Sequence, residues 1–555
     1  MPFNQPAPEL ANQYTSDRVL RSYLRRVLPP GVLQEIEPGL AQMGELAGGA
    51  LYTLQKADRL NEPVHTAWDP WGNRIDEIAV TPLWREAEQL AARSGLIAIP
   101  FEAEHAQWSR VHQFALVHLF TPSTDVYSCP LAMTDGARRT LSLSGNREVS
   151  ERALAHLTSR DPAQFWTSGQ WMTESTGGSD VGLTETEARQ DGEGHWHLHG
   201  RKWFTSAISS QMALTLARPQ GNPKGSKGLA LFYLETRDAQ GKLNHIQLNR
   251  LKDKLGTRKV PTAELTLDGA IAIPVRGMSD GVRDISPMLN VTRTWNSVSA
   301  VSYMRRAIAL ARNYAGKRFA FGALLSDKPL HLDTLAGMQA EFEAAFHLTF
   351  FLVELLGRED TNQLSAGEKE LLRLITPIVK ATTGKQCVAV VSEALECFGG
   401  AGYIEDTGLP MLLRDCQVFS IWEGTTNVLS LDALRAVASG TALAALGNCI
   451  SELRLSSSDP RLLKLAEVAN TAFSQAARWF ELAAGDGANL EAGARRFALT
   501  LGRALALALL VRHAQWSLTR ERDERPLAAA ARFARHGVDL ITNEDSSSTR
   551  SIALD

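Results

Sequence analysis

Hydrophobic and polar positions follow two different periods along this 555-residue chain. From about residue 18 to 159, and again from about 286 almost to the end, apolar residues recur every three or four positions, which predicts amphipathic helices. Between residues 165 and 275 the period falls to two, and Gly, Asn and Asp turns separate short runs. That pattern predicts a β-domain of antiparallel strands between two helical regions.

Local signals refine this outline. The expected strands lie at residues 195–199, 213–216, 229–234 and 264–267. Ser, Asp, Pro and Gly residues at 456–460 and 485–487 break the helical pattern near the end of the chain. The polar tail at 543–548 is expected to fray.

The length exceeds what one hydrophobic core supports, so we expect several structural regions. We predict an N-terminal helical domain at 1–164, a central antiparallel β-domain at 165–278, a C-terminal helical bundle at 279–444 and an extra helical extension at 445–555. The expected fold class is α+β and mostly α. The apolar run at 504–511 is too short to span a bilayer and is interpreted as a buried helix face, so no membrane span is expected.

Composition changes this picture little. Apolar residues make up 44% of the chain, charged residues 21%, and the formal net charge is -3, which is ordinary for a globular protein and favours no polyanionic partner. Five cysteines without a C-x-x-C pair indicate reduced thiols in a cytoplasmic protein. The first residues have no basic or apolar region of a secretory signal. We predict no metal site.

The most informative segment is residues 421–427, which read IWEGTTN. Glu423 lies there between a bulky apolar stretch and a Gly-Thr turn. The charged form of a carboxylate is costly against apolar surface, so such a group suits proton abstraction from carbon. Taken alone, a glutamate in this setting is more often a helix N-terminal acid or a solvated turn residue.

Other motifs accompany this segment in a definite order. Residues 171–180 read WMTESTGGSD, residues 200–206 read GRKWFTS and residues 250–258 read RLKDKLGTR. Further on, RFAFG at 318–322 precedes a glycine-rich turn at 399–400. That turn is either a helix C-cap or a place where backbone approaches a phosphate. A strand–GxGxxG–helix unit is missing from the sequence, which argues against a Rossmann dinucleotide site.

In this combination the motifs resemble those of the acyl-CoA dehydrogenase family, and their spelling is closest to its AidB-type (adaptive-response) subgroup. The resemblance implies two sets of residues that bind FAD. One set would line the flavin ring and comprises Thr173, Ser179, Trp203 and Thr205. The other would reach the pyrophosphate, with the arginine acting on a neighbouring subunit, and comprises Arg318, Phe321, Gly399 and Gly400. Without the motifs, Trp203 would be an ordinary core aromatic and Arg318 a solvated helix residue.

The resemblance also assigns the chemistry. Glu423 matches the family's catalytic base, which would remove the α-proton of an acyl thioester as hydride leaves the β-carbon for the flavin. Thr425 and Asn427 would hold the turn and touch the cofactor. Some members place the base elsewhere, at a position that is Thr292 here and cannot serve. Glu396 departs from the family, because many members have a glutamine there near the pyrophosphate.

These observations favour a FAD-dependent acyl-CoA dehydrogenase that works with an electron-transfer acceptor, assembles as a homotetramer and resides in the cytoplasm. The alternative is an AidB-like, DNA-associated flavoprotein that protects against alkylation damage and has weak dehydrogenase activity. A third possibility, an oxidase such as a nitroalkane oxidase, normally carries Asp at the base position, so Glu423 argues against it. Residues 445–555 contain 14 Lys and Arg against 13 Asp and Glu, so DNA binding is possible but not favoured.

Overall fold

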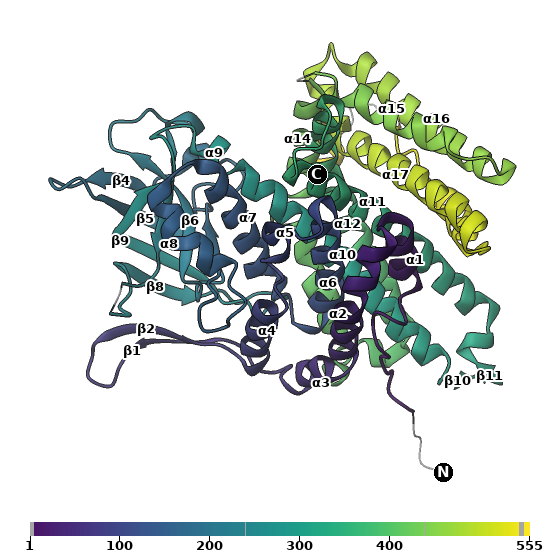
Figure 1. Ribbon diagram of the computed structural model, residues 1–555, viewed down its shortest axis with the longest axis horizontal. Helices are drawn as coiled ribbons and strands as arrows, with labels where there is room; N and C mark the ends of the chain where they lie inside the picture. Colours follow the sequence, from purple (N-terminus) through teal and green to yellow (C-terminus); the bar gives the residue numbers. More distant parts are fainter. Residues whose placement is uncertain (1–4, 239, 439, 543–548, 555) are drawn as a thin grey trace. The chain divides into compact units, whose positions relative to one another are not determined.

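Helices and strands follow the two sequence periods, and the predicted fold class is confirmed. The computed structural model describes residues 5–238, 240–438, 440–542 and 549–554. Figure 1 labels the helices and strands. The fold divides into two units. Unit 1 comprises residues 1–49, 105–119 and 296–555, and unit 2 comprises residues 50–104 and 120–295. The four predicted domains stay a prediction, because each unit combines segments from several of them.

Unit 2 is built on one sheet, in which the strand order is β3-β6-β4-β5-β9-β7, with β8 on β9 and a further pairing of β6 with β7. The strands are β3 (Ser168–Trp171), β4 (Glu187–Gln190), β5 (Trp196–Ser206), β6 (Met212–Pro219), β7 (Ala230–Glu235), β8 (Ile246–Leu251) and β9 (Thr262–Pro274). The four runs predicted as strands therefore fall on β5, β6, β7 and β9. Their inward residues, such as Leu198, Phe232 and Leu265, form a common core.

The alternating pattern predicted a purely antiparallel sheet, and this prediction was wrong. β3 and β4 both run parallel to β6, with Ser168 opposite Met212 and Glu187 opposite Arg218. The chain leaves the edge of β6 after β3, forms the loop at 172–186, and returns to the same edge as β4. A period of two fixes which face a residue occupies but carries no information about strand direction. The loop that leaves the edge contains the TESTGGSD motif.

A β-hairpin interrupts the region that was expected to be helical. β1 (Val64–Trp68) pairs with β2 (Arg74–Ala79), and the Asp69–Gly72 turn, in which Gly72 has φ of +83°, joins them. Asp76 at φ +43° accepts from His65 and from the backbone N–H of Leu248, which ties the hairpin to β8. The turn signal was visible in the sequence, but the flanking strands are short and half exposed.

The helices of unit 2 begin at residues that suit helix N-termini. Thr81 accepts from the backbone N–H of Trp84, and Asn146 accepts from that of Val149; such caps stabilise a helix by about 1 kcal/mol. The helices are α3 (Ala50–Ala57), α4 (Pro82–Arg93), α5 (Ile99–Glu102), α7 (Ser128–Ser144), α8 (Arg147–Leu157) and α9 (Gly281–Asp284), with 3-10 turns η2 (Thr121–Ser123), η3 (Val181–Leu183) and η4 (Ser226–Gly228). α10 (Ser286–Ala315) starts in unit 2 and ends in unit 1.

In the part of unit 1 that the structure describes, one small hairpin, β10 (Phe319–Ala320) with β11 (Ala323–Leu324), accompanies the helices. Its helices are α1 (Arg18–Val27), α2 (Pro30–Gly48), α6 (Ser109–Phe120), α11 (Pro329–Asp360), α12 (Ala366–Glu396), α13 (Leu409–Cys416), α14 (Thr426–Ala438), α15 (Ala442–Leu455), α16 (Pro460–Ala483), α17 (Gly487–Arg520), α18 (Arg525–Arg535) and α19 (Thr549–Leu554), with η1 (Ala106–Trp108), η5 (Leu325–Asp327), η6 (Gly399–Gly402), η7 (Glu405–Thr407) and η8 (Gln417–Ser420).

The predicted breaks lie where α15 gives way to α16 and α16 to α17. Asp459 precedes the proline that starts α16 and accepts from the backbone N–H of Arg461. Asp486 accepts from the N–H groups of Ala488 and Asn489 at the start of α17. The tail at 543–548, which was expected to fray, lies outside the described residues.

The extension shares its core with the bundle. α17 packs against α11, α12, α14 and α16, and the run from Ala504 to Val511 is buried, as predicted. By length and composition α17 could cross a membrane, but 83% of its most apolar window is buried inside the fold. Gly502 brings α17 close to α12, since a Cβ there would collide with Thr382 and meet Ile378 at 3.0 Å. α17 is therefore a core helix.

Candidate active site

The two motifs of the β-domain meet in unit 2. The backbone N–H of Trp203 donates to the carbonyl of Thr173 across 2.9 Å. The loop after Thr173 closes on itself, because Glu174 and Gly177 exchange backbone hydrogen bonds of 3.2 Å. Gly177 allows this closure, since a Cβ would lie 2.5 Å from the carbonyl oxygen of Asp180. Ser179 is exposed on the same loop.

A buried ion pair holds these motifs together. Lys202 Nζ donates to Glu174 at 2.7 Å and to the carbonyl of Leu216 at 2.8 Å, and Lys202 is fully buried. Glu174 also accepts from the backbone N–H of Glu185 and from the Thr186 hydroxyl. Burial would raise the pKa of Glu174, but Lys202 and these donors outweigh it, so the pKa is lowered. The sequence analysis did not predict this ion pair. Its two residues were visible there as a glutamate in the motif at 171–180 and a lysine in the motif at 200–206.

Trp203 and Thr205 lie differently in the sheet. Trp203 is 36% exposed, and Lys252 Nζ lies 3.5 Å from the centre of its ring while also pairing with Glu264 at 2.7 Å. Thr205 is buried and donates its hydroxyl to the carbonyl of Ala263 at 2.6 Å. Trp203 thus presents an aromatic surface, whereas the Thr205 hydroxyl proton is already used within the sheet. The flavin contacts of both residues stay predictions.

The predicted base lies in unit 1 on the segment between η8 and α14, here called the Glu423 turn (residues 421–425). Glu423 has φ of +56° and Gly424 φ of +101°, a left-handed conformation that is unusual for a glutamate. Glu423 and Trp422 are partly exposed. The Thr425 carbonyl accepts from the N–H of Leu429, and its side-chain oxygen lies 3.4 Å from the N–H of Val428. Thr425 therefore caps α14, and the exposed Asn427 lies in the first turn of that helix.

Two neighbouring helices contact this turn through polar side chains. On α10, Asn296 accepts from Trp422 Nε1 and donates to the carbonyl of Phe419 at 3.1 Å. On α12, the buried Lys380 donates to the carbonyl of Gly424 at 2.6 Å. Sequence reasoning did not single out either residue. The signal for Lys380 is a lone lysine within an apolar helix run.

The predicted pyrophosphate residues lie on two segments of unit 1. Arg318 follows α10, and its guanidinium donates to the Gln5 side chain at 3.2 Å. Phe321 at φ +49° is 96% exposed at the tip of the β10–β11 hairpin. Gly399 at φ +58° and Gly400 follow α12 and are exposed. The rings of Tyr314 and Phe398 lie 5.0 Å apart and join the end of α10 to this turn.

The departures from the family pattern also have places in the fold. Glu396 is exposed at the end of α12. Thr292 is buried on α10 and donates to the carbonyl of Leu289 in its own helix, so its hydroxyl is used within the helix.

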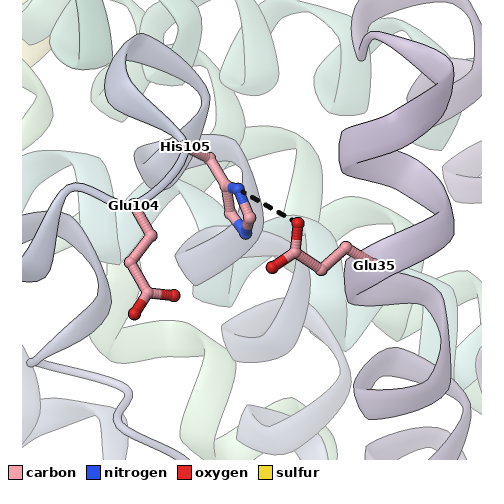
Figure 2. Close-up of side chains that lie close together, drawn as sticks. All are labelled: Glu35, Glu104 and His105. Atoms are coloured by element: carbon pink, nitrogen blue, oxygen red, sulfur yellow. Dashed lines mark ion pairs between the residues drawn. The ribbon is translucent and has the colours of Figure 1, made fainter.

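Figure 2 shows a further group outside the predicted site, in which His105 Nδ1 lies 4.0 Å from the exposed Glu35 carboxylate, with Glu104 the preceding residue. We assign no metal to this group, in which Glu35 and Glu104 are exposed.

In unit 2 a partly exposed tryptophan thus lies beside a glycine-rich loop, and in unit 1 a carboxylate lies on a turn with positive φ. Four family models match consecutive parts of the chain. They are "Adaptive response protein AidB N-terminal domain" at 4–162, "Acyl-CoA dehydrogenase, middle domain" at 169–270, "Acyl-CoA dehydrogenase, C-terminal domain" at 279–438 and "Acyl-CoA dehydrogenase 11 C-terminal domain-like" at 441–554.

Comparison with individual proteins gives the same family as the family models. Acyl-CoA dehydrogenase family member 11 of Caenorhabditis elegans is 44% identical over 530 residues, which cover 92% of this chain and 86% of that protein. AidB of Escherichia coli (strain K12) is 32% identical over 78% of this chain and 79% of its own length. The crystal structure of Caenorhabditis elegans ACDH-11 in complex with C11-CoA has a TM-score of 0.96 at 41% identity and covers 100% of this chain and 97% of that one. The Bd2924 apo-form has a TM-score of 0.87 at 46% identity, over 92% of this chain and all of that one.

The chain therefore belongs to the acyl-CoA dehydrogenase family, whose members are FAD-dependent oxidoreductases. The match to the AidB N-terminal domain and the identity to AidB itself confirm the predicted subgroup resemblance.

Proposed function

We propose that this chain dehydrogenates the acyl group of a coenzyme A thioester between its α- and β-carbons, with Glu423 as the base that takes the α-proton. The observation that carries this proposal is the Glu423 turn, where a carboxylate follows a tryptophan on a left-handed backbone and precedes a helix N-terminus. A strained backbone at a carboxylate is typical of a functional position. A base whose position is fixed before the substrate binds contributes roughly 10²–10⁴-fold to the rate.

FAD, when bound, supplies the hydride acceptor. The residues of unit 2 fit a flavin, because an exposed tryptophan face lies next to a loop whose glycines leave backbone groups accessible. Trp203 would contact the ring, and Thr173 and Ser179 would offer hydroxyl and backbone groups. The buried Glu174–Lys202 pair supports this role, since it fixes the loop against the strand that carries Trp203.

In unit 1, Arg318, Phe321, Gly399 and Gly400 are proposed to bind the pyrophosphate. Gly399 has positive φ, and a Cβ added there would meet nothing within 4 Å, so an incoming phosphate would find backbone and open space. We propose that the protein is a homotetramer in the cytoplasm, that Arg318 acts across a subunit interface, and that electrons leave through an electron-transfer acceptor. The exposed Phe321 supports an interface at the β10–β11 hairpin.

For the acyl group, we propose a chain similar in length to that of C11-CoA. The support is the ACDH-11 complex with C11-CoA, which matches this chain over its whole length. The test is turnover of a panel of saturated acyl-CoAs with an artificial electron acceptor, together with the flavin absorbance of the purified protein. Turnover that peaks near C11-CoA is expected. A folded protein without flavin absorbance after addition of FAD, or a flavoprotein inactive on every member of the panel, would refute the proposal.

DNA binding is the second candidate function, and the identity to AidB is the reason to test it. We propose that duplex DNA is not a strong ligand. Arg525 is engaged by Glu343, and the acidic residues Glu521 and Asp523 are interleaved with the arginines of this segment. Duplex binding depends on phosphate neutralisation, so tight binding with a steep salt dependence, lost when Arg520 and Arg522 are replaced by glutamine, would overturn this view.

A further inference from the structure

The backbone of the Glu423 turn is held in a conformation that costs free energy. A non-glycine residue with positive φ costs on the order of 1–3 kcal/mol and persists only where the surrounding contacts impose it. Here Glu423 at φ +56° and Gly424 at φ +101° follow one another. The residues that maintain this conformation also decide where the carboxylate lies.

One contact acts immediately before Glu423. Asn296, which is 3% exposed on α10, accepts from the indole N–H of Trp422. Its amide also donates to the carbonyl of Phe419 at 3.1 Å. The single amide therefore fixes both the side chain that precedes the base and the end of η8.

A second contact acts immediately after Glu423. Lys380 is fully buried on α12, and its ammonium group donates to the carbonyl of Gly424 at 2.6 Å. One helical turn further on, a Cβ at Gly384 would lie 2.8 Å from the carbonyl oxygen of Phe419, so α12 packs its backbone closely against η8. A charged donor in a buried setting makes a stronger hydrogen bond than a neutral one.

We propose that Asn296 and Lys380 are positioning residues for proton abstraction. Asn296 holds the Trp422 side chain and the Phe419 carbonyl before Glu423, Lys380 holds the Gly424 carbonyl after it, and together they fix the direction of the Glu423 carboxylate. This inference rests on the proposed function, in which Glu423 is the base. Neither residue needs to touch the substrate. Displacement of a reacting group by about 1 Å can lower a rate about 10²-fold, so we expect each contact to affect the chemical step more than substrate binding.

The test compares Lys380→Met and Asn296→Leu with the conservative Lys380→Arg and with Lys369→Met, an exposed lysine on the same helix that serves as the control. Flavin reduction by C11-CoA is followed by anaerobic stopped flow. The rate should fall roughly 10–100-fold in the first two variants while the apparent Kd changes less than about threefold. Lys380→Arg should recover part of the loss, and the control should match the wild type. Amide hydrogen exchange at residues 420–426 of the flavin-free protein should become faster in Lys380→Met.

A combination with Glu423→Gln separates this inference from the proposed function. If the two residues act only through Glu423, Lys380→Met has no further effect on the residual rate of Glu423→Gln. Unchanged reduction and exchange in both single variants would refute the positioning role while leaving Glu423 as the base. Unchanged reduction in Glu423→Gln would refute both. If Lys380→Met fails to fold, Trp422→Phe removes the donor to Asn296, and an unaltered rate in that variant would likewise refute the inference.

Discussion

Replacing Lys202 by methionine should destabilise unit 2 strongly. The change leaves the buried Glu174 carboxylate without its cation and the Leu216 carbonyl without its donor. Removal of one partner of a buried ion pair costs about 3–5 kcal/mol. Glu174 keeps its hydrogen bonds from Glu185 and Thr186, which argues for the lower half of that range, about 3–4 kcal/mol. At about 2–4 °C per kcal/mol for a unit of this size, the transition of unit 2 should move down by roughly 6–16 °C.

Differential scanning calorimetry measures this shift, and a matched exposed pair provides the control. Arg147 and Glu151 form an exposed i,i+4 pair on α8, so Arg147→Met should cost less than about 1 kcal/mol. The double change Glu174→Leu with Lys202→Met removes both charges and should recover part of the stability, because the Leu216 carbonyl and the donors of Glu185 and Thr186 then lack their partners. A shift below about 2 °C for Lys202→Met, or no recovery in the double variant, would refute the reasoning. Because the pKa of Glu174 is lowered in the fold, its contribution is present above about pH 4.5 and is lost as pH falls through the folded value.

Three further predictions concern unit 1. Burial, with Arg26 and Arg512 nearby, lowers the pKa of His347 and His513 well below the usual value. For each histidine, the free energy of unfolding should therefore decrease by up to about 1.4 kcal/mol per pH unit as the pH falls below about 6.5. A thermal midpoint that is flat between pH 7.5 and 5.5 would contradict this. Gly502→Ala should cost about 1–3 kcal/mol in denaturant unfolding through collision with α12, whereas Gly367→Ala, with open space around it, should be nearly neutral; equal effects would be inconsistent with close packing of α17. Arg318→Ala should release FAD on gel filtration and loosen the tetramer, and a monomer with full flavin content would exclude the cross-subunit role.

Much of the fold could be predicted because its signals are local. Pro460 and Gly487 lie at helix starts whose caps are visible in the sequence, and the alternating runs fell on β5, β6, β7 and β9. The parallel pairing of β3 and β4 with β6 could not be predicted, since it depends on where the motif loop returns to the sheet. The β1–β2 hairpin was missed because helical segments flank it on both sides.

The candidate site shows the same division between local and distant information. The Glu423 segment was recognisable from its apolar and Gly-Thr neighbours. The structure adds the positive φ of Glu423, which the amino-acid sequence alone does not determine. Asn296 and Lys380 were missed because each is one of several polar residues on a long helix, more than 40 residues from the turn that it contacts. Their partners become apparent only when α10, α12 and the turn are packed together.

The central claim is that Glu423 takes the α-proton. The most direct measurement is the rate of flavin reduction by C11-CoA in Glu423→Gln, with Glu481→Gln, an exposed glutamate on α16, as the matched control. The account predicts a folded variant with normal FAD content, in which reduction is at least about 10²-fold slower than in the wild type and in the control. Reduction at the wild-type rate in Glu423→Gln would show that another group is the base and would contradict the account.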